Sequence, residues 1–455
     1  MWTLRQGHRP AGDGASPGTL GPAGLRNSLE SAPRLVPAGL PLSTTSANLP
    51  ELRLRRGEDR RLRAGHLWVF SNEVDTAATP LTAFEPGQQA RVVTDRGQPL
   101  GVAYVNPATL IAARLLTRDA ETPVGRAWVL TRLRAALALR ESLYPKPYYR
   151  LVFGEADGLP GLVIDRYGDV LVGQIGTAGM ERLRPVIEAA LVKVIAPRVL
   201  LWKNDSGARS VEALPSEIVC VQGDMPTELE VRETLPDGRE LRFAIPFESA
   251  QKTGWFYDQT FNRSLLGRFL PPGKRVLDVC SYAGGWATTA AALGAPAITC
   301  IDSSASALAL AGVHVQAVVA GDGAAPVVPT LLRDDAFDAL AALAAAGERF
   351  DAVIVDPPAF IKRRKEFPQG QAAYRKLNQL AMRVLEPEGL LVSCSCSFHM
   401  PGEDLRGAIQ SAARHVDRFV QVLHQGGQSP DHPVHPAIPE TRYLKAFFCR
   451  VTRSL

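Results

Sequence analysis

The sequence has few cysteines, no long apolar segment and none of the short motifs of the commonest zinc and dinucleotide sites. Six cysteines in 455 residues, none in a tight repeated spacing, do not predict a disulfide framework. No apolar run approaches the ~20 residues that a membrane helix needs, so we expect a cytoplasmic protein without membrane contact. CxxC and HExxH are absent, which predicts no metal site, and the absence of GxGxxG counts against a dehydrogenase.

Length and charge are compatible with a multidomain protein that binds a polyanion. A single core rarely grows past ~250–300 residues, so 455 residues predict two or three domains. The net charge of +5 permits phosphate contacts without demonstrating them. Six arginines lie within residues 53–63, and they fit a solvated surface or an RNA contact equally well; they are Arg53, Arg55, Arg56, Arg60, Arg61 and Arg63.

Three segments precede the C-terminal part of the chain. Residues 1–50 are rich in Gly, Pro, Ser and Ala without periodicity, so we expect a disordered extension. Residues 51–118 predict a small β-barrel, because turn residues separate short strands at 67–70, 90–93, 100–105 and 110–115. Residues 119–230 predict a small α+β domain, with helices at 125–142 and 180–194 and strands at 151–153, 162–165 and 170–172.

Residues 231–455 change character and predict an α/β domain with a Rossmann-like parallel sheet. Strand-like runs at 275–279 and 297–302 are each followed by a helical segment, at 286–293 and 305–313. Further apolar runs end at Asp356 and Cys394. Such alternation is typical of βαβ units, which bind ligands at the carboxyl ends of their strands.

The first strand of this sheet leads into a glycine-containing loop that fits a nucleoside ligand. Gly284 and Gly285 precede a helix and would let the backbone approach a ligand closely. Asp278 lies at the end of that strand, and Asp302, which ends the next, is placed to accept hydrogen bonds from ribose hydroxyls. We interpret the loop as a site for S-adenosylmethionine, although a carboxylate at a strand end can also cap a helix.

Two later strand ends extend the predicted site. Asp335 is the best candidate for the adenine amino group, and Asp356 precedes Pro357 and Pro358. Successive prolines end a strand and fix a rigid turn, where substrate atoms can be held. Many enzymes that methylate exocyclic amines have an aromatic residue directly after Pro-Pro. Here Phe360 stands one position later, which weakens that chemistry.

Four consecutive cations follow this turn: Lys362, Arg363, Arg364 and Lys365. They are either a solvated loop or a phosphate contact near the site, and we include Lys362, Arg363 and Arg364 among the substrate-binding candidates.

A cysteine pair ends the last apolar strand, within residues 393–397. Carbon 5 of a pyrimidine is too weak a nucleophile to take a methyl group unaided, whereas addition of a thiolate to carbon 6 activates it. Free cysteines often only fill a core, and strand parity cannot separate Cys394 from Cys396. Cys396 lies nearer the carboxyl end of the strand, so we choose it as the nucleophile.

With these residues, the sequence resembles the ribosomal RNA large subunit methyltransferase I family over about residues 52–453. The shared motifs are Trp68-Val69-Phe70-Ser71, Gly154-Glu155-Ala156-Asp157-Gly158-Leu159-Pro160-Gly161, Ile164-Asp165-Arg166, Lys252-Thr253-Gly254, Asp258-Gln259, Ser281-Tyr282-Ala283-Gly284-Gly285, Asp356-Pro357-Pro358, Ser395-Cys396-Ser397, Asp431-His432-Pro433 and Tyr443-Leu444-Lys445. The resemblance implies an RNA-binding PUA domain at 51–118, a central domain at 119–230 and a methyltransferase domain at 231–455.

The resemblance also implies an activity, C5 methylation of a cytosine in 23S rRNA or a large-subunit precursor, with Cys396 as nucleophile. It places Lys252, Thr253, Gln259 and Tyr282 in the cofactor pocket. The N-terminal extension and the second cysteine, Cys394, depart from the family. The sequence does not decide whether the protein forms a homodimer or which group acts as the base that removes the C5 proton.

Two other hypotheses use the same residues. One is methylation of another base or RNA, which would not need Cys396. The other is a non-catalytic RNA-binding assembly factor, which would have no reason to keep acidic residues at three strand ends.

Overall fold

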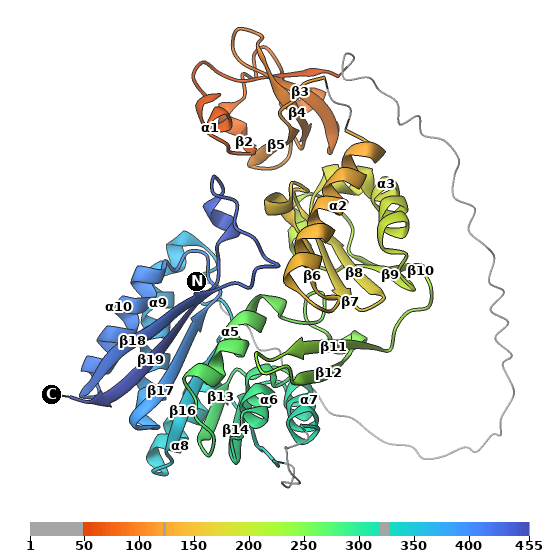
Figure 1. The fold of residues 1–455 in the computed structure, drawn as a ribbon. Helices are drawn as coiled ribbons and strands as arrows, with labels where there is room; N and C mark the ends of the chain where they lie inside the picture. Colours follow the sequence, from red (N-terminus) through yellow and green to blue (C-terminus); the bar gives the residue numbers. More distant parts are fainter. Residues whose placement is uncertain (1–48, 122–123, 319–326, 455) are drawn as a thin grey trace, which may run out of the picture. The chain divides into compact units, whose positions relative to one another are not determined.

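The computed structural model describes residues 49–121, 124–318 and 327–454 (Figure 1). The disorder predicted for residues 1–50 therefore falls, apart from the last two of them, outside the described residues. Within the described ranges, no helix combines the length and apolar character needed to cross a membrane.

The first sheet forms the predicted small β domain. Its strands are β1 (Glu51–Arg53), β2 (Trp68–Phe70), β3 (Gln88–Val93), β4 (Pro99–Val105) and β5 (Ile111–Thr117), in the order β1-β3-β4-β5-β2. The four predicted strands are confirmed, and β1 adds a parallel partner to β3. The short helix α1 (Arg60–Arg63) lies in the arginine-rich segment. Apolar residues at alternate strand positions, such as Val69, Val92 and Ala103, form the core.

The second sheet has helices on one face and a hairpin on the other. It contains β6 (Tyr148–Phe153), β7 (Leu162–Tyr167), β8 (Val170–Ile175), β9 (Val199–Asn204) and β10 (Glu217–Gln222), in the order β10-β9-β8-β7-β6. Helices α2 (Arg126–Leu143) and α3 (Ala178–Ile195) share one core with this sheet, and α4 (Ala208–Val211) follows β9. The hairpin β11 (Glu228–Thr234) and β12 (Glu240–Pro246) shares another core with β7, β8 and β9.

The third sheet is the predicted Rossmann-like sheet. Its order is β15 (Thr330–Arg333), β14 (Ala297–Asp302), β13 (Arg275–Val279), β16 (Phe350–Val355), β17 (Leu385–Ser395), β19 (Lys445–Arg453) and β18 (Arg418–Gly427). The first five strands are parallel, whereas β19 is antiparallel to both of its neighbours.

Helices cover both faces of this sheet (Figure 1). Successive residues of β13 point to opposite faces, so Val276 joins the core with α5 (Thr260–Leu265), α6 (Gly285–Ala292) and α7 (Ala305–Gln316). Leu277 joins the core with α8 (Ala336–Ala345), α9 (Phe367–Arg383) and α10 (Gly402–Arg414).

The strand order reverses between β13 and β16. From β13 the chain proceeds outward through β14 and β15, and it then returns to β16 and β17 on the other side. Ligands of open α/β sheets bind where the order reverses, beyond the carboxyl ends of the strands. The candidate residues at the ends of β13, β14, β16 and β17 therefore belong to one edge.

Candidate active site

The loop after β13 has an unusual backbone. Cys280, Tyr282 and Gly284 all have a positive φ, of 63°, 48° and 78°. A Cβ at Gly284 would lie 2.8 Å from Cα and Cβ of Ala311 in α7. Glycine is thus required at 284 for the packing of α6 on α7, and its close approach to a ligand stays a prediction.

Asp278 is fully buried at the end of β13. One of its carboxylate oxygens accepts a hydrogen bond from the Ala287 backbone N–H at 3.1 Å, whereas the other has no partner within the described residues. Burial raises the pKa of Asp278 to about 8, and the charges of Asp356 and Asp302 add to the effect. The buried Ser281 hydroxyl likewise lacks a partner there. Unsatisfied buried polar atoms are uncommon, so this strand end fits a polar ligand that completes them.

Asp302 ties the β13 loop to the end of β14. Its carboxylate accepts hydrogen bonds from the backbone N–H groups of Tyr282 and Ser304, each at 2.9 Å. Each oxygen keeps a second lone pair, which can accept a hydrogen bond from a ribose hydroxyl.

Asp335 is exposed and forms the N-cap of α8. Its side chain accepts a hydrogen bond from the Phe337 N–H at 2.8 Å. Helix capping is therefore the contact that this carboxylate makes, and its contact with adenine stays a prediction.

Asp356 lies at the centre of the edge. Its Oδ2 accepts hydrogen bonds from Gln259 Nε2 at 2.9 Å and from the indole N–H of Trp286 at 3.1 Å. Burial raises the pKa of Asp356 to about 6. The structure thus brings Gln259 and Asp356 together, as predicted for one pocket, and adds Trp286, which sequence reasoning missed.

The Lys252–Gln259 segment sends its side chains in different directions. Lys252 is exposed, with its ammonium 4.8 Å from the centre of the Phe256 ring. Thr253 is fully buried and donates a hydrogen bond to Asp165 of β7. That hydroxyl is therefore engaged with the second sheet, and Lys252 is the member of the pair that is free to reach a ligand.

The structure separates the two cysteines that sequence parity could not. Cys394 is fully buried in the core shared with α6, whereas Cys396 follows the last residue of β17 and is half-buried. The Cys396 sulfur lies 3.9 Å from the carbonyl oxygen of Pro357. Burial raises the pKa of Cys396 to about 11; Asp356 adds to the increase, and Lys252 and Lys445 oppose it. Burial raises the pKa of Cys394 well above its ordinary value.

Two serines anchor Cys396 on either side. The hydroxyls of Ser395 and Ser397 each lie 2.9 Å from the hydroxyl of Tyr374 in α9, and Ser397 also accepts the Ile361 N–H at 3.2 Å. Because alternate residues of an extended chain point to opposite sides, Cys396 points away from α9. This arrangement explains the Ser-Cys-Ser pattern: the serines fix the backbone, and the cysteine between them faces the edge.

Phe360 and the cations after it lie around the Pro357–Pro358 turn. The centre of the Phe360 ring lies 4.8 Å from that of Tyr374 and 6.0 Å from that of Phe337. The ring therefore packs against α8 and α9, and this contact does not support a role in base stacking. The cations of residues 362–365 are exposed, and none of their side chains forms an ion pair within the described residues. They remain available for phosphate.

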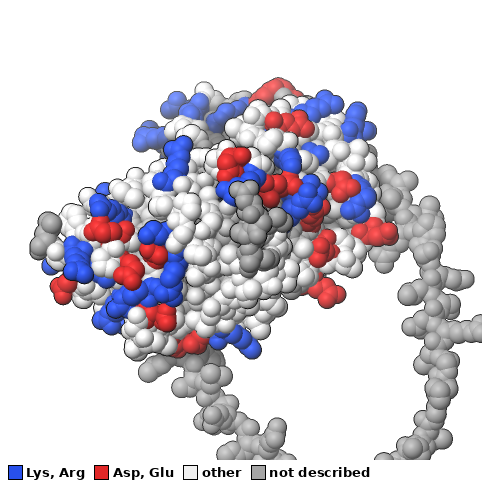
Figure 2. All heavy atoms as spheres, turned by 60° about the horizontal axis from the view of Figure 1, so that its bottom comes forward, with Lys and Arg blue, Asp and Glu red and all other residues white. Residues whose placement is uncertain are grey.

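The arginines of residues 53–63 are partly engaged within the first domain. Arg61 forms a 2.6 Å ion pair with the buried Glu73, and Arg55 donates to the Val74 carbonyl at 3.1 Å. Figure 2 shows positive and negative side chains interspersed over the face that it presents, so surface charge alone does not mark a binding site.

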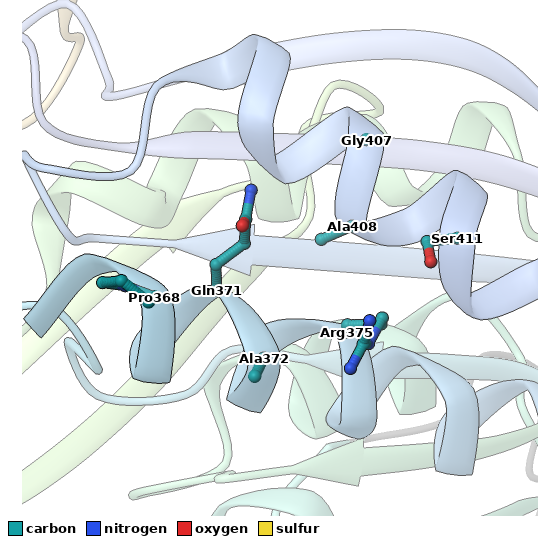
Figure 3. A pocket seen from close by; sticks show the side chains of 7 residues that line it. All are labelled: Pro368, Gln371, Ala372, Arg375, Gly407, Ala408 and Ser411. Carbon is teal, nitrogen blue, oxygen red and sulfur yellow. The ribbon is translucent and has the colours of Figure 1, made fainter.

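The site residues do not lie in the groove between α9 and α10 (Figure 3). This hollow of about 340 Å³ is lined by Pro368, Gln371, Ala372, Arg375, Gly407, Ala408 and Ser411. The candidate active site is instead the edge where β13, β14, β16 and β17 end.

Comparison with known proteins agrees with this architecture. The family model of PUA-like domains matches residues 52–118, and that of S-adenosylmethionine-dependent methyltransferases matches residues 225–448. A Streptococcus mutans protein described as a SAM-dependent methyltransferase shares the fold, with a TM-score of 0.72 and 20% identity over 88% of this chain and 100% of its own. Another methyltransferase, solved in complex with SAH, gives a TM-score of 0.73, with 20% identity over the same shares of both chains.

Curated relatives are more similar in sequence. The ribosomal RNA large subunit methyltransferase I of Salmonella arizonae is 34% identical over 412 residues, which is 90% of this chain and 99% of the relative. That of Cronobacter sakazakii is 33% identical over 401 residues, 88% of this chain and 98% of the relative. The chain is therefore an S-adenosylmethionine-dependent methyltransferase that belongs to the ribosomal RNA large subunit methyltransferase I family.

Proposed function

We propose that this protein transfers a methyl group to C5 of a cytosine in 23S rRNA, with Cys396 as the nucleophile. The observation that carries the proposal is the placement of Cys396: it stands beside Asp356 and Pro357 at the edge where the strand order reverses. Relatives named for the RNA of the large subunit and the PUA-like match support rRNA as the substrate.

Cys396 activates the base in this proposal. Its thiolate adds to C6 of the cytosine, and the electron pair of the C5–C6 double bond shifts to C5–C4 while N3 takes up a proton, which gives an enamine with a nucleophilic C5. Bound S-adenosylmethionine supplies the electrophilic methyl group. Loss of the C5 proton then re-forms the double bond and expels Cys396 as a thiolate.

The remaining residues at the edge hold the two reactants. Asp302 accepts hydrogen bonds from the ribose of the cofactor, and the free oxygen of Asp278 with the Ser281 hydroxyl completes the polar contacts. Gln259 and Trp286 fix the carboxyl group of Asp356 next to Cys396. Pro357 and Pro358 form the rigid wall of the base site.

RNA phosphates contact the exposed cations of residues 362–365, which lie a few positions after this wall. The first domain supplies a second contact through the arginines that have no ion pair within residues 49–121, such as Arg56 and Arg60.

The test compares wild-type protein with Cys396→Ala, and with Cys394→Ala as the matched control. Each is incubated with 23S rRNA and S-adenosylmethionine labelled in its methyl group, and the RNA is digested to nucleosides. We expect 5-methylcytidine from the wild type and from Cys394→Ala, and a loss of at least about 100-fold for Cys396→Ala.

Two results would reject the proposal. Full activity of Cys396→Ala would favour methylation of an exocyclic amine, which needs no thiol. Failure of the wild-type protein to bind S-adenosylmethionine in calorimetry would favour a non-catalytic assembly factor. Bisulfite mapping of 23S rRNA from cells with and without the gene then identifies the position.

A further inference from the structure

Lys445 is a buried lysine directly beside the proposed nucleophile. It is the first residue of β19, is paired with Ser395 of β17 and is only 6% exposed. Its ammonium donates hydrogen bonds to the carbonyl oxygens of Ser397 at 2.5 Å and of Tyr443 at 2.8 Å. Within the described residues it has no carboxylate partner. A buried cation without a carboxylate partner acts strongly on nearby charges, because the protein interior screens it less than water does.

Charged groups of both signs surround Cys396. Asp356 follows β16 and Asp258 lies in the 3-10 turn Tyr257–Gln259, and both oppose ionisation of the thiol. Lys252 and Lys445 favour it. Tyr374 of α9 lies on the far side of the flanking serines, and Arg442 is the cation that acts on Lys445. Lys252 has the larger effect on the pKa of Cys396, but it is exposed to solvent screening, whereas Lys445 is buried and fixed by two backbone carbonyls.

We infer that Lys445 is the positioning residue of Cys396: through the Ser397 carbonyl it fixes the backbone that carries the sulfur, and its charge favours the thiolate. This inference rests on the proposed role of Cys396. In ionisation the thiol gives its proton to solvent, and the sulfur keeps the electron pair that later bonds to C6 of the base. Lys445 itself gains and loses no bond.

The titration of both groups is consistent with this arrangement. Burial lowers the pKa of Lys445 to about 8, while the neighbouring Cys396 raises it. Lys445 is therefore mostly protonated at pH 7 and loses its charge above about pH 8. The support that it gives to the thiolate should be present at neutral pH and decline in alkaline solution.

The test measures the reactivity of Cys396 against pH in the full-length protein. Iodoacetamide alkylates the thiolate, and mass spectrometry of the peptide that contains Cys396 gives its rate apart from the other cysteines. Lys445→Gln keeps a donor for the Ser397 carbonyl but removes the charge, Lys445→Arg keeps the charge, and Lys445→Met removes both. Lys274→Met is the matched control, because Lys274 precedes β13 at the opposite end of the strands.

We expect alkylation at pH 7.5 to fall about tenfold in Lys445→Gln and Lys445→Met, to recover largely in Lys445→Arg and to be unchanged in Lys274→Met. Thermal unfolding and S-adenosylmethionine binding confirm that each variant is folded. If Lys445→Met fails to fold, Lys445→Gln against Lys445→Arg decides the question alone.

An unchanged pH profile in Lys445→Gln overturns the inference. That outcome leaves the proposed function intact if Cys396→Ala has lost its methyltransferase activity. Conversely, a shifted profile together with a fully active Cys396→Ala supports the electrostatic pairing and rejects the thiolate mechanism.

Discussion

Replacement of Asp278 by asparagine should change the pH dependence of stability in a defined direction. The carboxyl group is fully buried, and one of its oxygens has no partner among the described residues. Burial raises the pKa of Asp278 in the folded protein to about 8, from an ordinary value of 3.8. Below pH 3.8 both the folded and the unfolded chain hold the proton. Between pH 4 and 8 only the folded chain holds it, so stability falls as the pH rises.

The size of the effect follows from proton linkage. One proton held only by the folded state changes the free energy of unfolding by about 1.4 kcal/mol per pH unit, so three pH units give an upper limit of about 4 kcal/mol. Asparagine is close in shape and keeps an acceptor for the Ala287 N–H, but it does not titrate. Its own unsatisfied amide destabilises the protein equally at every pH and cancels in the comparison.

The assay is thermal unfolding without cofactor at pH 5, 6.5 and 8. We expect the melting temperature of Asp278→Asn, relative to wild type, to rise between pH 5 and 8 by up to about 8–16 °C, at ~2–4 °C per kcal/mol. Asp338→Asn is the control, because Asp338 is an exposed residue in the first turn of α8. A difference that stays constant with pH, or that falls, would refute the assignment of a neutral carboxyl group at 278.

Three further predictions concern the scaffold and the RNA contact. Tyr374→Phe removes the hydroxyl that joins Ser395 and Ser397, so it should lower the free energy of unfolding by about 1–3 kcal/mol. The control variant Tyr148→Phe should leave the free energy of unfolding unchanged. Urea unfolding measures both variants. Gly284→Ala should lower the free energy of unfolding by about 1–3 kcal/mol more than Gly238→Ala does. Both glycines have a positive φ, but only a Cβ at 284 would clash with a neighbouring residue. Equal losses of stability would show that α7 moves to accommodate the added methyl group. Replacing the four cations of residues 362–365 by alanine should weaken RNA binding. The slope of log affinity against log salt concentration should fall by about 0.7–0.9 for each phosphate that the loop no longer neutralises. An unchanged slope would exclude the loop from the RNA interface.

Most central strands of the third sheet could be predicted from the sequence, but its edge strands and the buried β19 could not. β13, β14 and β16 are buried on both faces, so their apolar runs are nearly continuous. β18, at the edge of the sheet, contains only exposed and half-buried residues, and β15 is only four residues long and mostly exposed. Neither has the apolar run that identified the others. The hairpin of β11 and β12 was missed although its two strands alternate buried residues with exposed or half-buried ones and Asp237-Gly238 lies in the turn that joins them.

Some residues of the candidate site could be predicted from the sequence, and others could not. Asp278, Asp302 and Asp356 could be found because acidic residues end apolar strands. Trp286 and Tyr374 could not, since an aromatic residue in a helix gives the same signal whether it fills a core or bonds a polar group. Lys445 belonged to a motif of the resemblance, but only the pairing of β19 with β17 brings it to Cys396.

The most direct test of the account is to trap the bond between enzyme and base. RNA that carries 5-fluorocytidine has no C5 proton to lose, so after methyl transfer the cysteine cannot be expelled and a covalent complex accumulates. Digestion and mass spectrometry should locate the adduct on the peptide of Cys396, in wild type and in Cys394→Ala, and only when S-adenosylmethionine is present. An adduct on Cys394, or methylated RNA without any adduct, would contradict the account.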